Sequence, residues 1–264
     1  MSAKLTWRTA LVEHWPEYLI EAWALGMFMV SASLFTLWFE DPASVLNHAI
    51  MNGDVRRALI GLAMGITAVM LIYSPWGKRS GAHMNPAVTL AFFSLGRIEA
   101  WNALFYVVAQ FIGGSIGVLL VWSLYGDAFA SPPVAFIATM PGSAGNGTAF
   151  AAETALSFSM MLTVLIVSQQ ARWSRCTGVV AGILVACFIA FAAPLSGMSI
   201  NPARTLASAL PGGMWHAIWI YLTAPVLGMW MATRVFTCAK PKPGCARLCP
   251  HSAKTSCLHC GYTP

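Results

Sequence analysis

Residues 80–90 of the chain read Ser-Gly-Ala-His-Met-Asn-Pro-Ala-Val-Thr-Leu, and residues 196–206 read Ser-Gly-Met-Ser-Ile-Asn-Pro-Ala-Arg-Thr-Leu. Seven of the eleven positions are identical in register. A single Asn-Pro-Ala tripeptide would indicate only an ordinary helix start, because asparagine is a common N-cap and proline suits the first helical turn. An eleven-residue repeat in a strongly apolar chain indicates a duplication, with one polar interruption and one helix start in each half.

The composition predicts an all-α membrane protein. Of the 264 residues, 58% are hydrophobic and only 9% are charged, whereas a soluble domain has about 25% charged residues. Several apolar segments approach the roughly 20 residues that a helix needs to cross a bilayer. The six expected spans are residues 18–39, 56–74, 101–124, 149–170, 178–195 and 215–238. Residues 85–94 and 201–209, which follow the repeated motif, are helical by pattern but too short to span, and are therefore expected to be re-entrant half-helices.

Pairs of glycines four residues apart occur in three of the expected spans. Small residues at this spacing let helix backbones approach each other closely in lipid. The pairs are Gly61/Gly65, Gly113/Gly117 and Gly178/Gly182. They favour tight packing between the spans.

The formal net charge of +6 is distributed unevenly along the chain. Cytoplasmic loops of membrane proteins carry an excess of Lys and Arg, and with both termini inside most basic residues fall on that side. These residues are Lys4, Arg8, Lys78, Arg79, Arg97, Arg172, Arg175, Lys240, Lys242, Arg247 and Lys254, against Arg56 and Arg57 outside. The pattern predicts a multi-pass protein of the plasma (cell inner) membrane with cytoplasmic termini. The basic charge thus follows topology and gives no reason to expect a nucleic-acid partner.

Each half of the chain has the same order of elements: two spans, a short interrupted helix and a third span. Since three spans are an odd number, the second half enters the membrane from the side opposite to the first. Such inverted repeats place their functional sites near the bilayer midplane, around a pseudo-two-fold axis in the membrane plane.

Two carboxylates occupy corresponding positions in the first span of each half, Glu21 and Glu153. Within apolar stretches, both are expected to face the bundle interior or water. One interpretation is a proton-relay pair. The alternative, which their symmetric placement favours, is that they accept hydrogen bonds from backbone N–H groups of the re-entrant loops, which have no water at that depth. Gln110 in the third span is a similar scaffold candidate.

The repeated motif also predicts a particular chemistry. Pro86 and Pro202 suit the first helical turn, and Asn85 and Asn201 can cap it while each keeps its amide NH₂ free to project outward. Because the half-helices start inside the membrane, their positive dipole ends would meet near the midplane. Two amide donors and two positive helix ends favour a neutral species that presents an oxygen lone pair, and disfavour cations and a conducting proton wire.

These residues resemble the aquaporin, or major intrinsic protein, family. The resemblance rests on the two Asn-Pro-Ala boxes, the Ser-Gly-x-x-x before each, Arg204 after the second, and the two glutamates. It implies six tilted helices and two half-helices meeting at their N-termini, assembled as a homotetramer with a pore in each subunit. It covers about residues 17–238, with repeat one at about 17–124 and repeat two at about 148–238. Residues 1–16 and 239–264 would be a cytoplasmic N-terminal segment and a cytoplasmic Cys-rich tail.

By position, the resemblance implies roles for individual residues. The motif residues Asn85, Pro86, Ala87, Asn201, Pro202 and Ala203 would lie midway along the pore, with the asparagines as donors. Arg204 would be a fixed positive charge in the outer selectivity filter. A hydrogen-bonding ladder of carbonyls would come from Gly81, Ala82 and His83 in the first loop and from Gly197, Met198 and Ser199 in the second.

The remaining filter positions follow from counting along the chain. Counting back from Asn201 without a gap assigns Ile189 in the fifth span and Met198 in the second loop. The second-span position falls at Gly65 by ungapped counting, or at Met64 if the stretch before the first loop carries a one-residue insertion.

The solute choice stays open at this stage. Water-selective family members usually have histidine where this chain has Ile189, and glycerol facilitators have glycine. Thr205, Ala209 and Tyr221 resemble water channels, whereas Leu222 resembles glycerol facilitators. We therefore expect a passive channel for water that excludes ions and protons, and leave open whether glycerol or another small neutral solute also passes. Its partners would be those solutes and membrane lipid.

The tail has the pattern C-x3-C-x7-C-x2-C, formed by Cys245, Cys249, Cys257 and Cys260. Four thiolates could form a tetrahedral zinc site, and cytoplasmic placement argues against a stable disulfide framework. The alternative is a disordered tail with reduced thiols. No cofactor is otherwise expected.

Two other functional classes compete with a channel. A secondary transporter with alternating access also has inverted repeats and broken helices, and would couple transport through Glu21 and Glu153. An intramembrane enzyme would need a nucleophile and a base, and His83 is the only plausible base at depth. It has no Ser/Asp or Cys/His constellation with it, so we expect no enzymatic activity.

Overall fold

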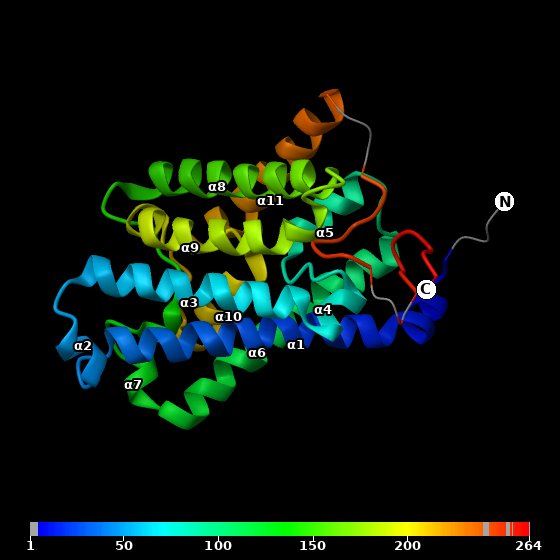
Figure 1. Ribbon diagram of the computed structural model, residues 1–264. Coiled ribbons are helices and arrows are strands. Elements are labelled where there is room, and N and C mark those ends of the chain that lie inside the picture. Colours follow the sequence, from blue (N-terminus) through cyan, green and yellow to red (C-terminus); the bar gives the residue numbers. More distant parts are fainter. Residues whose placement is uncertain (1–4, 240–242, 252–253, 255, 264) are drawn as a thin grey trace.

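The computed structural model of the chain describes residues 5–239, 243–251, 254 and 256–263. In this part of the chain every regular element is a helix, and the long helices run side by side as a bundle (Figure 1). Three residues of the topology argument, Lys4, Lys240 and Lys242, lie outside the described residues.

Six long helices account for the six expected spans. They are α1 (Trp7–Glu40), α3 (Gly53–Tyr73), α6 (Ala100–Tyr125), α8 (Gly145–Ser168), α9 (Thr177–Ser196) and α11 (Ile218–Ala239). Within the described residues, five segments are long and apolar enough to cross a membrane, and the fifth of them runs from Ser174 to Ser196. The sixth long helix, α11, packs closely along α8: a Cβ added at Gly228 would lie 2.2 Å from the carbonyl oxygen of Thr154.

The two short helices after the repeated motif are also confirmed. They are α5 (Pro86–Ser94) and α10 (Pro202–Gly212). Short connecting helices complete the bundle: α2 (Val45–Ala49), α4 (Pro75–Ser80), α7 (Asp127–Ala130), and the 3-10 turns η1 (Ala135–Ile137) and η2 (Ser174–Cys176). The sequence did not predict α4, an extra turn between α3 and the first loop. The expected all-α class, with six long helices and two half-helices, is confirmed.

The half-helices tie the two halves of the chain together. Helix α5 belongs to the first half but packs against α11 of the second, and α10 of the second half packs against α6 of the first. Their N-termini meet in the middle of the bundle. Each half is thus completed by a short helix from the other, as an inverted repeat requires.

Glycines set the closest helix contacts, as the glycine pairs predict. In the contact between α1 and α6, a Cβ added at Gly113 would lie 2.0 Å from the carbonyl oxygen of Ala22. In the contact between α3 and α9, a Cβ at Gly65 would lie 2.5 Å from the carbonyl oxygen of Gly182. Real Cβ atoms do not approach backbone so closely, so these crossings exist only because the side chains are absent.

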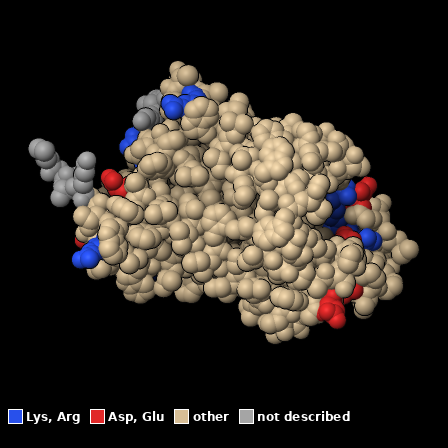
Figure 2. All heavy atoms as spheres, turned by 180° about the vertical axis from the view of Figure 1, so that it is seen from behind, with Lys and Arg blue, Asp and Glu red and all other residues tan. Residues whose placement is uncertain are grey.

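Charged side chains gather at the two ends of the molecule and leave an uncharged band between them (Figure 2). One end carries the ion pairs Arg56–Glu40 and Arg57–Asp54, at 3.0 and 2.7 Å. The other carries Arg79–Glu17 at 2.7 Å. A helix of 21 residues such as α3 is about 30 Å long, which matches the hydrocarbon core of a bilayer.

The α1–α6 contact gives a stability prediction. We expect Gly113→Ala to destabilise the fold by about 1–3 kcal/mol or more, because the new methyl group must push two helix backbones apart. Gly147→Ala is the control, since nothing lies within 4 Å of a Cβ added there, and the replacement favours helix by about 0.5–1 kcal/mol. Thermal unfolding in detergent would measure both. Equal midpoints for the two variants would contradict the tight crossing.

Candidate functional site

The two half-helices begin with the expected asparagine caps. The side-chain oxygen of Asn85 accepts from the backbone N–H of Ala87 at 2.8 Å. That of Asn201 accepts from Ala203 and Arg204 at 3.1 and 3.3 Å. Because each oxygen faces its own helix, the amide NH₂ of each asparagine points away from it, toward the centre of the molecule.

Neither amide NH₂ group is wholly free, which corrects the expectation that both project outward without a partner. Asn85 donates to the carbonyl of Ile200 at 2.7 Å, and Asn201 donates to the carbonyl of Met84 at 2.8 Å. An amide NH₂ has two N–H donors, so each asparagine uses one to bind the opposite loop and keeps the second. Both asparagines line a cavity, and the second donors are therefore available there.

Buried glutamates hold the two loops in place. Glu21 accepts from the backbone N–H groups of His83 and Met84 at 3.0 and 2.6 Å, and from Ser80 Oγ at 2.7 Å. It also accepts from Gln110 Nε2 at 2.8 Å. These contacts satisfy loop N–H groups that lipid cannot satisfy, and they favour a scaffold over a proton relay.

Glu153 repeats this arrangement in the second half. It accepts from the backbone N–H groups of Ser199 and Ile200 at 2.9 and 2.6 Å, and from Ser196 Oγ at 2.7 Å. Like Glu21, it is fully buried. The two carboxylates thus serve corresponding loops through corresponding atoms, which is the symmetry expected of a duplicated support.

A pair of tyrosines, which sequence reasoning did not assign to the loops, supports them from the other side. Tyr106 donates to the carbonyl of Ser80 at 2.8 Å, and Tyr221 donates to the carbonyl of Ser196 at 2.7 Å. Both side chains are fully buried. Their equivalent places in the two repeats, in the third span of each, are the signal that could have identified them.

The supported loops have left-handed backbone at equivalent residues. Ala82 and Met84 have φ of 57° and 49°, and Met198 and Ile200 have φ of 49° and 48°. Residues with a Cβ rarely adopt this region, and such strain persists only where surrounding contacts over-determine it. The glutamates and tyrosines supply those contacts.

A cavity of about 550 Å³ runs past both loops. One end is lined by charged residues of the α1–α3 connection, and the other reaches Leu248 of the tail. Of the expected carbonyl ladder, the residues on its wall are His83, Gly197, Met198 and Ser199. Gly81 and Ala82 are not on this wall, and the carbonyl of Gly81 accepts instead from the backbone N–H of Leu248 at 3.1 Å.

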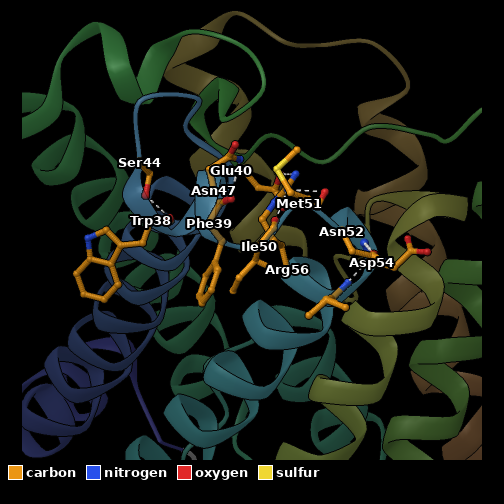
Figure 3. Close-up of polar contacts among 11 residues, drawn as sticks. Trp38, Phe39, Glu40, Ser44, Asn47, Ile50, Met51, Asn52, Asp54 and Arg56 are labelled. Carbon is orange, nitrogen blue, oxygen red and sulfur yellow. Dashed lines mark hydrogen bonds and ion pairs between the residues drawn. The ribbon is translucent and has the colours of Figure 1, made fainter.

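The charged end is a compact hydrogen-bonded structure (Figure 3). Arg56 pairs with Glu40 and donates to the carbonyl of Ile50 at 2.9 Å. Arg57 pairs with Asp54 and donates to the carbonyl of Ala190 at 3.0 Å. These contacts fix the α1–α3 connection to α9. Both members of the second pair line the cavity, so a solute entering here meets a fixed charged rim.

Arg204 lies on the cavity wall beyond that rim, and its guanidinium donates to the hydroxyl of Thr139. In the described part of the chain no carboxylate forms an ion pair with it. Its charge therefore acts within the cavity. Ile189 and Met198 line the same wall, so the structure brings these three expected filter residues together around one space.

The second-span filter position needs a correction. Gly65 does not line the cavity, because it packs against Gly182 of α9, whereas Met64 does line it. Ile60, one turn earlier, also lines the cavity, and a Cβ on its neighbour Gly61 would lie 3.4 Å from Ile189 Cβ. Ile60 is therefore level with Ile189 and was missed by counting. The Ile60-Gly61 pair has the same bulky-then-glycine pattern as Met64-Gly65.

The tail also differs from its expected ligand set. Ligand atoms of Cys245, His251, Cys257 and Cys260 lie within 4.8 Å of one another. Cys249 lies elsewhere: its thiol donates to the carbonyl of Gly77 in α4 at 3.6 Å. The structure therefore brings together three of the four predicted cysteines, with His251 as the fourth member of the cluster in place of Cys249. The signal was present, because His251 lies two residues beyond Cys249.

The comparisons with known proteins agree with this geometry. Residues 8–236 match the family model described as "Major intrinsic protein". The chain belongs to the major intrinsic protein family. Aquaporin NIP1-1 of Arabidopsis thaliana is 36% identical over 201 residues, which cover 74% of this chain and 66% of the relative. Aquaporin NIP2-3 of Zea mays is 33% identical over 219 residues, which cover 81% and 69%.

The chain thus spans about two thirds of the length of the curated relatives it matches. Among solved structures, the aquaglyceroporin from Plasmodium falciparum superposes with a TM-score of 0.70 at 21% identity, covering 84% of this chain and 95% of that one. That likeness confirms the fold. Family membership and the apolar helices together make this a multi-pass membrane protein.

The loop supports predict the outcome of a conservative substitution. Glu153→Gln should lower stability by about 1–3 kcal/mol, because an amide has one acceptor oxygen where the carboxylate uses two. The control is Glu13→Gln, at an exposed position in α1, which should leave the unfolding temperature unchanged. A Glu153→Gln protein with unaltered stability that lost a proton-coupled flux would show a relay instead.

Proposed function

We propose that the chain is a passive membrane channel for water that also admits small neutral solutes such as glycerol and excludes ions and protons. One observation carries the proposal. The N-termini of α5 and α10 meet at a continuous cavity, where each presents an asparagine with one amide N–H left over. The family and the names of its relatives support the same class of function.

The geometry favours neutral solutes for an electrostatic reason. The N-terminus of a helix carries a partial positive charge, so two of them facing one passage repel cations. Arg204 adds a full positive charge on the same wall. Donors on both asparagines would orient a passing water so that its oxygen accepts, which breaks the donor–acceptor chain that a proton needs.

The filter lining supports passage of solutes larger than water. Ile60, Met64, Ile189 and Met198 present apolar side chains to the cavity, and Arg204 and the loop carbonyls present polar groups. An amphipathic polyol can place its carbon skeleton against the former and its hydroxyl groups against the latter. Permeation itself needs no cofactor in this proposal, since donors and acceptors of the chain perform all of it.

Topology and assembly belong to the proposal as well. The basic residues predict cytoplasmic termini and a location in the plasma (cell inner) membrane. The family resemblance implies a homotetramer. Large apolar side chains exposed on the long helices, among them Leu62, Ile116 and Phe191, would then face lipid or neighbouring subunits.

The competing functions receive less support from the same contacts. In a coupled transporter Glu21 and Glu153 would have to bind and release ions or protons, yet both hold loop N–H groups. In an enzyme His83 would have to act as a base, yet its ring nitrogens contact Thr89 Oγ1 at 3.1 Å and the carbonyl of Ala246 at 3.0 Å. In a channel, neither the glutamates nor His83 needs to exchange a proton or react.

The proposed function is tested by stopped-flow permeability in proteoliposomes. The assay uses the wild type and Leu248→Gly, because Leu248 of the tail lines one end of the cavity and its removal widens that end. At least one of these two proteins should conduct water rapidly, with weak temperature dependence and no dependence on an ion or proton gradient. Gradient-dependent flux would indicate a transporter, and vesicles no more permeable than protein-free ones would contradict the channel.

Solute choice is predicted to depend on Ile189. Ile189→His narrows the filter and adds a polar wall, so the ratio of glycerol to water permeability should fall several-fold. Leu222→Tyr is a matched control, because Leu222 is not on the cavity wall. Unchanged glycerol permeability in Ile189→His would show that this position does not set selectivity.

A further inference from the structure

The Cys-rich tail folds back into the bundle at the end opposite the charged rim (Figure 1). Among its described residues 243–251, 254 and 256–263, Ala246, Leu248 and Cys249 are buried in one apolar cluster with residues of α3, α8 and α9. This burial is unexpected for a polar, proline-rich segment. The segment is therefore held in place by specific contacts with the rest of the protein.

The tail covers the first loop of the candidate pore. The backbone N–H of Leu248 donates to the carbonyl of Gly81 at 3.1 Å, and the carbonyl of Ala246 contacts the ring of His83 at 3.0 Å. His259 donates to the carbonyl of Ser80 at 2.9 Å, and its ring stacks on that of His83. Loop groups that would face permeating water are therefore bonded to the tail.

Arg247 fastens this segment to the body of the protein. Its side chain is buried, and the guanidinium donates to the carbonyls of Lys78 in α4 and of Pro250 in the tail itself. It also contacts Cys257 Sγ at 3.1 Å. Arg247 thus connects the docked segment to the Cys/His cluster.

That cluster has the composition and geometry of a structural zinc site. Cys245 Sγ lies 3.4 Å from Cys257 Sγ, and His251 Nε2 lies 3.1 Å from Cys260 Sγ. Four ligands around one tetrahedral zinc, with Zn–S near 2.3 Å, lie about 3.5–3.8 Å from one another. Three sulfurs and one imidazole within 4.8 Å therefore need only small shifts to enclose the ion, and C-x2-C is a common ligand spacing.

A metal also explains how so short a segment stays folded. A segment of this size has too little apolar surface to offset its own ordering entropy. A structural zinc ion supplies that free energy directly, because the site exists only in the folded state. Ala246, Arg247 and Leu248 lie between the first two ligands in sequence, so ordering the cluster also orders Leu248, which lines the cavity, and Ala246, which contacts His83.

We propose that Cys245, His251, Cys257 and Cys260 bind zinc, and that the zinc-bound tail is a plug in the mouth of the pore. The inference rests on the proposed channel function. With zinc bound, Leu248 and Ala246 occupy the mouth and the channel is closed. Without zinc the tail leaves, the carbonyls of Ser80 and Gly81 face water, and the channel opens.

Zinc binding is tested on the full-length purified protein by elemental analysis. The wild type should hold about one zinc ion per chain, as a four-ligand site does. Cys245→Ser and His251→Ala should lose most of it. Cys249→Ser tests the ligand set, because its thiol contacts Gly77 and should not matter, and Cys187→Ser on the exposed face of α9 is a second control. Zinc-free wild type, or zinc lost in Cys249→Ser but kept in His251→Ala, would overturn the assigned site.

Docking of the tail is tested by trypsin, independently of transport. The buried side chain of Arg247 should resist cleavage while zinc is bound and be cut once a chelator removes it. Cleavage after the exposed Arg172 should be the same in both conditions, which controls for general unfolding. Equal cleavage after Arg247 with and without zinc would overturn the metal-held plug.

Gating is tested by water flux in proteoliposomes containing these proteins. Zinc-loaded wild type should conduct several-fold less water than the chelated wild type, Cys245→Ser or Leu248→Gly, and Leu248→Gly should keep its zinc. High flux in zinc-loaded wild type, equal to that of Leu248→Gly, would overturn the plug and leave the channel intact. If the wild type and both variants fail to conduct water although zinc binding and cleavage behave as expected, the proposed channel function is wrong. The proposed gating is then wrong as well.

Discussion

The structure depends on satisfying backbone polar groups where no water is present to do so. Two loops cross the middle of an apolar bundle, and in each of them two successive backbone N–H groups, those of His83 and Met84 and those of Ser199 and Ile200, bond to a side chain of another helix. Glu21 and Glu153 accept those hydrogen bonds, and Tyr106 and Tyr221 donate to carbonyls on the opposite side. The wall of the cavity is therefore backbone held at a fixed orientation, which is what selective passage of a hydrogen-bonding solute needs.

Features encoded by short-range chemistry could be predicted from the sequence. The asparagine caps, the half-helices and the glycine crossings each follow from residue type and spacing. Counting along the chain left Gly65 and Met64 as alternatives in α3, and only Met64 lines the cavity. Counting did not indicate Ile60, which lines it one turn earlier, because residue spacing does not show which turns of a helix face a cavity. His251 was not assigned to the cluster because the path of the backbone decides which side chains meet. The spacing of the cysteines along the sequence does not determine that path.

The departures from symmetry lie where function would place them. Where the second half has Arg204, the first half has Val88, so only one side of the midplane carries a fixed charge. Where the second loop has Ser199, the first has His83, whose ring contacts the tail. One half thus carries the arginine on the cavity wall and the other the contact with the tail, while the glutamate and tyrosine supports are the same in both.

The two asparagines also connect the two halves of the chain, across 115 and 117 residues of sequence. Asn85 donates to Ile200, and Asn201 donates to Met84. During synthesis Asn85 is made before Ile200, so the amide donor of Asn85 lacks this carbonyl partner until the second half has been made. Folding of the first loop is therefore completed only when the second loop arrives. A truncated chain or a separately expressed half would contain all the residues of its loop and still lack its final hydrogen bond.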